Sequence, residues 1–148
     1  HDPLRRQRQM CIRDSVSSLL KPDGKAVIQA ITINEQRYED YRKSVDFIKR
    51  YIFPGGCLPS LNIISGALTR MTDMQIIDLR DIAIDYAKTL KHWHEAFMAE
   101  LDAVKSLGFD EKFIRMWRFY LSYCEGGFRE RIIGTYQITM AKPYYRPL

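Results

Sequence analysis

The sequence predicts an α/β domain built as the later part of a doubly wound sheet. Three observations lead to this class: residues 25–33 form a strand pattern that is apolar on both faces, two more strand patterns occur at 74–82 and 132–140, and amphipathic helices separate them. A strand covered on both faces is typical of a parallel sheet whose crossover helices supply the cover. Because three strands alone leave an unpaired edge, we expect a ligand-binding half to precede them.

Size and composition agree with one globular domain. Of the 148 residues, 46% are hydrophobic and 12% aromatic, and the net charge is +5. This profile excludes a disordered or fibrous protein, and no apolar run is long enough to span a bilayer. The three cysteines include no CxxC pair, which argues against a disulfide framework or a zinc knuckle, and no stretch has the pattern of an export signal. We therefore expect a cytoplasmic protein without a metal site.

Residues 1–14 differ from the rest of the chain. They hold four arginines and two aspartates, show no periodic apolar pattern and resemble translated adapter sequence, so they are set aside as non-native. On this interpretation the natural protein continues upstream, and residues 15–148 are the C-terminal portion of a single domain. A basic arm that binds phosphate is the alternative.

The first strand, at 25–33, follows the end of a helix and a Pro-Asp-Gly turn. Asn34 can cap a second helix, because side-chain oxygens of this type accept hydrogen bonds from the first turn. The apolar residues from Tyr38 to Ile52 then recur at steps of three and four, which predicts one helix up to the stop at Pro54.

The remaining elements alternate in the same way. A short helix is predicted to begin near Ser60, with a strand at 74–82 after it. A long helix should run from about Ile84 to Gly108, and Asp110 should cap the next helix, which stops at the glycine pair 126–127. The last strand, at 132–140, has unlike faces.

The residues themselves give few signs of chemistry. Neither GxGxxG nor GxxxxGK[ST] occurs. Gly55 and Gly56 are interpreted as a helix stop and tight turn, with a backbone contact to a ligand as the alternative. His92 and His94 project about 200° apart on a helix and cannot share one metal ion. Cys124 lies on an apolar helical face, which favours the core.

Aromatic residues are the unusual feature of the composition. All Phe, Trp and Tyr residues lie between Tyr38 and Tyr145, on helices that are otherwise amphipathic. Core packing is one explanation, and an apolar channel for a long hydrocarbon substrate is the other.

Five segments carry a family resemblance. FIKRYIFPGGCLPS, at 47–60, resembles the hallmark stretch of the cyclopropane-fatty-acyl-phospholipid synthase family. The others agree in order and spacing: LLKPDGKAVIQAI at 19–31, DYAKTLKHW at 85–93, FDEKFIRMWRFYLSYCEGGFR at 109–129 and YQITMAKP at 136–143. The match covers essentially residues 16–143.

The resemblance implies a Rossmann-like methyltransferase, of which this chain supplies the last three strands, a helical insertion and long covering helices. The final strand would be antiparallel and lie between the other two. The implied reaction is methyl transfer from S-adenosylmethionine to the cis double bond of an unsaturated phospholipid acyl chain, which forms a cyclopropane with a bound bicarbonate ion as base. The family's cofactor-binding residues precede residue 15, so none is expected here, and the chain alone should be inactive.

Three site residues are implied by motif match. Tyr86 matches the tyrosine that hydrogen-bonds bicarbonate, and Ile31 matches the position whose backbone contacts the same ion. Gln29 stands where many members carry histidine, and this departure leaves open whether the product is a ring, a methyl branch or a methylene.

The implied partner is unsaturated phospholipid at the inner face of a membrane, with the protein peripheral and cytoplasmic. No nucleic-acid partner is expected, and a homodimer is left open. The competing function is a non-catalytic, basic, aromatic-rich module that binds anionic lipid or single-stranded nucleic acid. A truncated relic without function is a third reading.

Overall fold

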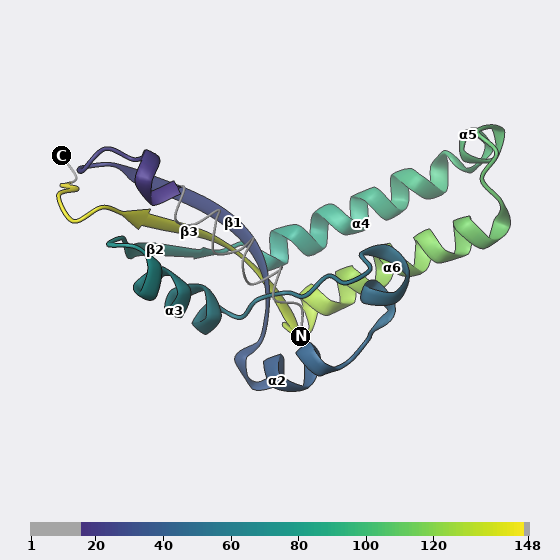
Figure 1. Cartoon of the computed structure of the whole chain (residues 1–148). Helices are drawn as coiled ribbons and strands as arrows, with labels where there is room; N and C mark the ends of the chain where they lie inside the picture. The colour runs from purple at the N-terminus through teal and green to yellow at the C-terminus, as the bar shows by residue number, and fades with distance from the viewer. Residues whose placement is uncertain (1–15, 147–148) are drawn as a thin grey trace.

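The computed structural model describes residues 16–146, and it places a three-stranded sheet beside a long helical hairpin (Figure 1). The strands are β1 (Lys25–Ile33), β2 (Gln75–Asp81) and β3 (Ile133–Ala141). The helices are α2 (Glu35–Lys43), the π-helix η1 (Ile48–Ile52), α3 (Leu61–Met71), α4 (Ala83–Ala99), α5 (Leu101–Ser106) and α6 (Glu111–Arg129). All three predicted strands are thereby confirmed.

The strand order is β1-β3-β2, and β3 is antiparallel to both neighbours. The pairing of β1 with β3 runs without a break from Lys25 opposite Ala141 to Ile33 opposite Ile133. The pairing of β2 with β3 shifts register next to Ile77. The expectation of a final antiparallel strand between the other two is confirmed.

Two apolar clusters lie on opposite faces of this sheet. The cluster under α3 consists of Ile64, Leu68, Met74, Ile138 and Met140, and the cluster under the hairpin consists of Ala83, Ala87, Leu90, Leu121 and Phe128. Ile28 of β1 packs against the first cluster and Ile31 against the second, which explains why this strand is apolar on both faces. The cover on the hairpin side is incomplete, because Val27 is 59% exposed.

The hairpin of α4 and α6 extends away from the sheet and turns at α5 (Figure 1). The Asp110 carboxylate accepts a hydrogen bond from the backbone N–H of Phe113 at 2.8 Å, as predicted for the cap of α6. The prediction of one helix up to Gly108 is wrong in detail, because α4 ends at Ala99 and α5 is a separate short helix.

Helix α6 also continues through the glycine pair at 126–127, where a stop was predicted, and ends at Arg129. Phe128 explains the difference. Its side chain is 1% exposed, and its ring lies 5.0 Å from the ring of Tyr86 on α4. Burying a phenylalanine contributes about 1.5–3 kcal/mol, which offsets the roughly 1–2 kcal/mol that two helical glycines cost together.

The helix predicted from Tyr38 to Ile52 is broken at residues 44–47. The Ser44 hydroxyl donates to the carbonyl of Tyr41, and the Asp46 carboxylate accepts from the backbone N–H of Lys49. These local bonds compete with the helical ladder, so α2 ends and η1 begins in a new direction. Asn34 makes no side-chain cap, and its amide instead donates to the carbonyl of Arg131.

Helix α3 begins where it was predicted. The Ser60 hydroxyl is fully buried and accepts a hydrogen bond from the backbone N–H of Ile63 at 3.3 Å. None of the helices between residues 16 and 146 has both the length and the apolar composition that a membrane span requires.

Ile138 is the most deeply buried apolar residue of β3, with no exposed surface. We expect Ile138→Ala to lower the free energy of unfolding by about 2–5 kcal/mol, because the deletion leaves a cavity in the α3 cluster. Urea denaturation followed by circular dichroism measures the change. The control is Leu107→Ala near the end of the hairpin, where the side chain is 76% exposed and the expected change is under about 0.5 kcal/mol. Equal losses in the two variants would contradict this core assignment.

Candidate functional site

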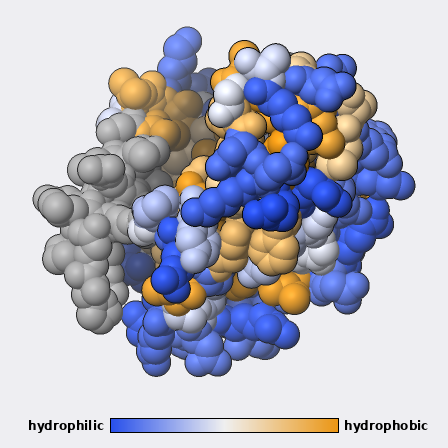
Figure 2. Space-filling view, turned by 90° about the vertical axis from the view of Figure 1, so that its right-hand side faces the viewer, coloured by the Kyte–Doolittle hydropathy of each residue, from blue (hydrophilic) through white to orange (hydrophobic). Residues whose placement is uncertain are grey.

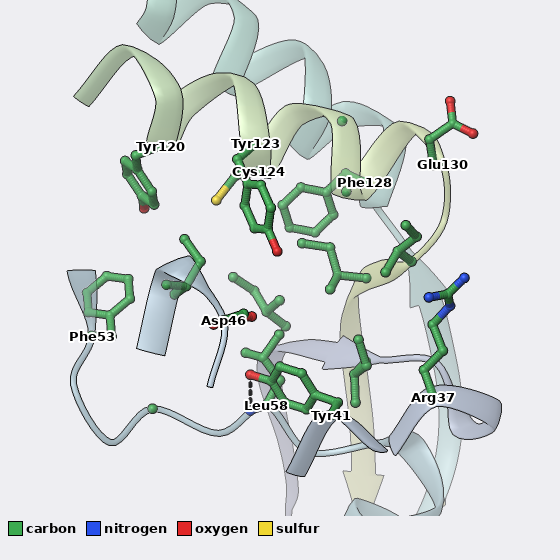
Figure 3. Close-up of a pocket in the computed structure, with 18 of the residues that line it drawn as sticks. Arg37, Tyr41, Asp46, Phe53, Leu58, Tyr120, Tyr123, Cys124, Phe128 and Glu130 are labelled. Atoms are coloured by element: carbon green, nitrogen blue, oxygen red, sulfur yellow. Dashed lines mark hydrogen bonds between the residues drawn. The ribbon is translucent and has the colours of Figure 1, made fainter. Parts of the chain in front are cut away.

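A pocket of about 750 Å³ lies between α6 and the segment that leads from β1 to α3 (Figure 3). In Figure 3, side chains of α6 point from above toward side chains of the opposite segment. The α6 wall is formed by Tyr120, Tyr123, Cys124 and Phe128, and the opposite wall by Tyr41, Asp46, Ile48, Phe53 and Leu58. The end of β1 and the first half of α4 close the cavity with Ile31, Ile33, Tyr86, Leu90 and Trp93.

The pattern of α6 explains how one helix serves both the core and the pocket. Ile114, Leu121 and Phe128 recur every seven residues and are all buried. Tyr120 and Cys124 stand one helical turn apart beside this stripe and lie on the pocket wall. Helix α6 therefore carries a buried stripe and, beside it, a stripe that lines the pocket.

Tyr41 and Lys49 hold the opposite wall together. The Tyr41 hydroxyl accepts a hydrogen bond from the backbone N–H of Leu58 at 3.2 Å. The Lys49 ammonium lies 3.6 Å from the centroid of the Tyr41 ring and donates to the carbonyls of Tyr41 and Ser44. One aromatic residue thus joins α2, η1 and the loop after η1 into a single wall.

Three tyrosine hydroxyls and one thiol of the pocket have a raised pKa and stay protonated at neutral pH. Burial raises the pKa of Tyr41 to about 12 and the pKa of Cys124 to about 11, and the charge of Asp46 adds to both shifts. Burial also raises the pKa of Tyr120 and of Tyr123. The lining therefore consists mostly of aromatic and aliphatic side chains and neutral donors, beside the charged residues Arg37, Asp40, Asp46 and Glu130, and its apolar part suits a hydrocarbon chain.

The predicted site residues fall into two groups. Tyr86 and Ile31 both line the pocket, where the start of α4 meets the end of β1. Gln29 is exposed and does not line it, although it shares a strand face with Ile31. The side-chain amide of Gln137 donates to the side-chain oxygen Oε1 of Gln29 at 3.5 Å. The catalytic roles assigned to the three residues stay predictions.

Two lining residues, Asp46 and Phe53, lie outside the periodic pattern of residues 38–52, whereas Tyr41 belongs to it. Tyr41, Asp46 and Phe53 come together only because the chain is broken between α2 and η1. Cys124, expected in the core, is partly exposed and borders the cavity. The turn at 55–56 is confirmed: Gly55 has φ 75°, and a Cβ on Gly56 would lie 2.9 Å from the Phe53 carbonyl oxygen.

Metal ligands do not gather anywhere in residues 16–146: no group of three or more His, Cys, Asp or Glu side chains is placed to hold an ion. Residues 1–14, interpreted above as non-native, lie outside the described part of the chain.

The raised pKa of Cys124 predicts slow alkylation. In the variant Cys11→Ser/Cys57→Ser, Cys124 is the one remaining cysteine. At pH 8 a shift from the ordinary value of 9.0 to about 11 leaves about 100-fold less thiolate. Iodoacetamide should therefore modify the folded protein about 100-fold more slowly than the urea-unfolded protein, with a rate that climbs about tenfold per pH unit up to pH 10. Equal rates at pH 8 would show that the thiol is not buried as described.

Two curated relatives illustrate what the chain is similar to. It is 41% identical over 128 residues to tuberculostearic acid methyltransferase UfaA1 of Mycobacterium tuberculosis, a match that covers 86% of this chain and 30% of that protein. It is 34% identical over 124 residues to the cyclopropane-fatty-acyl-phospholipid synthase of Escherichia coli K12, covering 83% and 30%. The chain thus spans about 30% of the length of these relatives.

Solved structures confirm the fold class. The mycolic acid cyclopropane synthase CmaA1, complexed with SAH and CTAB, matches with a TM-score of 0.81 and 26% identity over 92% of this chain and 50% of that one. The cyclopropane synthase MmaA2 of Mycobacterium tuberculosis matches with a TM-score of 0.79. The sequence pattern of the family described as mycolic acid cyclopropane synthetase matches residues 7–138. With that match over most of its length, the chain belongs to the mycolic acid cyclopropane synthetase family.

Proposed function

We propose that this chain is the C-terminal part of a methyltransferase that transfers a methyl group from S-adenosylmethionine to the cis double bond of an unsaturated phospholipid acyl chain, forming a cyclopropane. The observation that carries the proposal is the aromatic pocket of about 750 Å³, on whose wall Tyr86 and Ile31 meet. The names of the relatives, a tuberculostearic acid methyltransferase and a cyclopropane-fatty-acyl-phospholipid synthase, support the same reaction class.

The pocket walls suit both the substrate and the chemistry. An acyl chain gains about 0.8 kcal/mol for each methylene group that leaves water, and it needs no polar partner on the wall. Methylation of a double bond leaves a positive charge on the neighbouring carbon. The ring faces of Tyr120, Tyr123 and Phe128 can stabilise such a cation and keep water away from it.

S-adenosylmethionine supplies the methyl group, and the family resemblance assigns its binding residues to sequence before residue 15. Within the described chain, one buried polar side chain lies beside Ile31 on the sheet. Thr135 is paired with Ile31 across the sheet, and its hydroxyl is buried without a hydrogen-bond partner among the described residues. Its carbonyl accepts from the backbone N–H of Ile82, one helical turn before Tyr86.

We assign the donor role toward a bicarbonate ion to the hydroxyl of Tyr86 and to the backbone at Ile31. A bound bicarbonate would supply the base for the proton that is lost as the ring closes. Gln29 would reach the same ion only after its side chain leaves Gln137, so its role is the least supported of the three. The protein would act from the cytoplasm on phospholipid at the membrane, with a homodimer left open and no nucleic-acid partner.

Tyr86→Phe tests the site in the longer protein encoded by the reading frame upstream of residue 15. The ring and its contact with Phe128 are kept and only the hydroxyl is lost, so turnover should fall about 10-fold or more while the melting temperature hardly changes. Thermal unfolding and a methyl-transfer assay on unsaturated phospholipid measure both. Unchanged turnover would reject the role, and a parallel loss of stability and activity would make Tyr86 a core residue only.

The 148-residue chain by itself should transfer no methyl group, because the family's cofactor-binding residues lie outside it. The chain is incubated with labelled S-adenosylmethionine and vesicles of unsaturated phospholipid, with the longer protein as the positive control. Labelled lipid above background from the short chain would refute the expectation. Lipid binding without turnover in the longer protein would favour the non-catalytic lipid-binding module.

A further inference from the structure

An exposed group of aromatic side chains, here called the mouth patch, lies beside the pocket. It consists of Phe47, Tyr51, Phe53, Phe119 and Tyr123. Phe47 links η1 to α6, because its ring centroid lies 4.7 Å from that of Phe119 in an edge-to-face contact and 5.6 Å from that of Tyr51. Tyr51 is 57% exposed and Phe119 is 51% exposed, so the patch presents ring surface to solvent.

The mouth patch is continuous with the pocket. Tyr123 and Phe53 belong to both, and they are 43% and 58% exposed. Figure 3 shows Tyr123 pointing from α6 toward Asp46, and Phe53 on the opposite side below Tyr120. A molecule that enters the cavity on this side therefore passes over the patch.

Basic residues accompany the patch. The segment 42–53 contains four basic residues and one acidic residue. The Arg50 guanidinium lies 5.5 Å from the centroid of the Tyr51 ring. Among the described residues, neither Lys43 nor Arg50 forms a salt bridge with an acidic side chain. Their charges are therefore available to an external anion.

The far end of the hairpin has the opposite charge. Residues 100–111 hold four acidic residues and one basic residue. Leu107 and Phe109 are exposed there, at 76% and 44%. Seen from this end of the molecule, most of the surface is hydrophilic, with hydrophobic side chains between (Figure 2). An anionic surface would attract the mouth patch and repel the hairpin end.

We propose that the mouth patch docks the protein on a bilayer that contains anionic phospholipid, with the pocket opening toward the acyl chains. Tyr and Phe side chains enter the interface between headgroups and acyl chains, while Lys43 and Arg50 contact lipid phosphates. This inference rests on the proposed function, because it names the surface by which the same pocket reaches its substrate.

Charge at the patch is tested with two double variants that lower the net charge equally. Lys43→Gln/Arg50→Gln removes two of the four basic charges of segment 42–53, whereas Lys88→Gln/Lys91→Gln removes two from α4. Binding of the 148-residue chain to phosphatidylcholine vesicles with about one third phosphatidylglycerol is measured by cosedimentation. We expect the patch variant to bind about 10-fold or more weakly and the α4 variant to bind within about twofold of the original chain.

Ring insertion is tested with Phe119→Ala against Phe109→Ala, two exposed phenylalanines of which the first lies in the middle of α6 and the second at the turn of the hairpin. Phe119→Ala should weaken vesicle binding about fivefold or more and Phe109→Ala should not. Circular dichroism checks that each variant keeps its helical content. Should Phe119→Ala fail to fold, Tyr51→Ser replaces it, because Tyr51 is 57% exposed and packs only at the surface of the patch.

The docking inference and the proposed methyl transfer can be tested independently of each other. If the longer protein modifies acyl chains dispersed in detergent but does not bind anionic vesicles, the docking inference is overturned and the proposed function stands. If the chain binds vesicles through the patch but the longer protein transfers no methyl group, the proposed function is overturned and the docking inference stands. Three results would each overturn docking. The chain could bind pure phosphatidylcholine vesicles as tightly as anionic ones, or the patch and control variants could lose vesicle binding equally. The third result is a dimer of the chain that Phe119→Ala dissociates.

Discussion

The insertion of β3 between β1 and β2 is the constraint on which the rest of the structure depends. Both pairings are antiparallel, so the C-terminal end of β3 lies beside the N-terminal ends of β1 and β2. At the other end of β3, the Thr135 carbonyl accepts from Ile82, and Asn34 donates its backbone N–H to the carbonyl of Ile132. These bonds fix where α4 leaves β2 and where α2 leaves β1. The pocket forms between those two exits.

The pocket is a consequence of helix geometry as well as of sheet topology. Helix α6 buries one stripe against α4 and turns the neighbouring stripe, with Tyr120 and Cys124, toward the segment between β1 and α3. That segment can face α6 because Lys49 and Tyr41 hold its two helical pieces at an angle. Burial then keeps the phenols and the thiol neutral, which preserves an apolar interior.

Charged residues are distributed unevenly between the two ends of the molecule. The overall charge of +5 says little about partners, because the hairpin end is acidic and the segment beside the pocket is basic. The two regions also differ in how their aromatic rings are arranged. Phe109, Phe113 and Trp117 stack along α6, with centroids 4.3 and 5.7 Å apart, whereas the rings of the mouth patch join two different segments. A lipid surface can distinguish these ends through both charge and shape.

The sequence by itself determined the features that depend on neighbours along the chain. Strand positions follow from short apolar runs and, in the last strand, from unlike faces. The starts of α3 and α6 follow from Ser60 and Asp110, because a cap needs only the next turn of the same helix. Family motifs located Tyr86 and Ile31, which the fold then brought to one wall.

The tertiary structure decided what depends on distant contacts. The break between α2 and η1, the passage of α6 through two glycines and the position of Gln29 outside the pocket could not be predicted from periodicity. Phe128 overrides the glycine stop because Tyr86 and the apolar residues of α4, far away in sequence, bury its ring. Such outcomes are set by packing energies between segments, and a local pattern contains no information about the partner that supplies them.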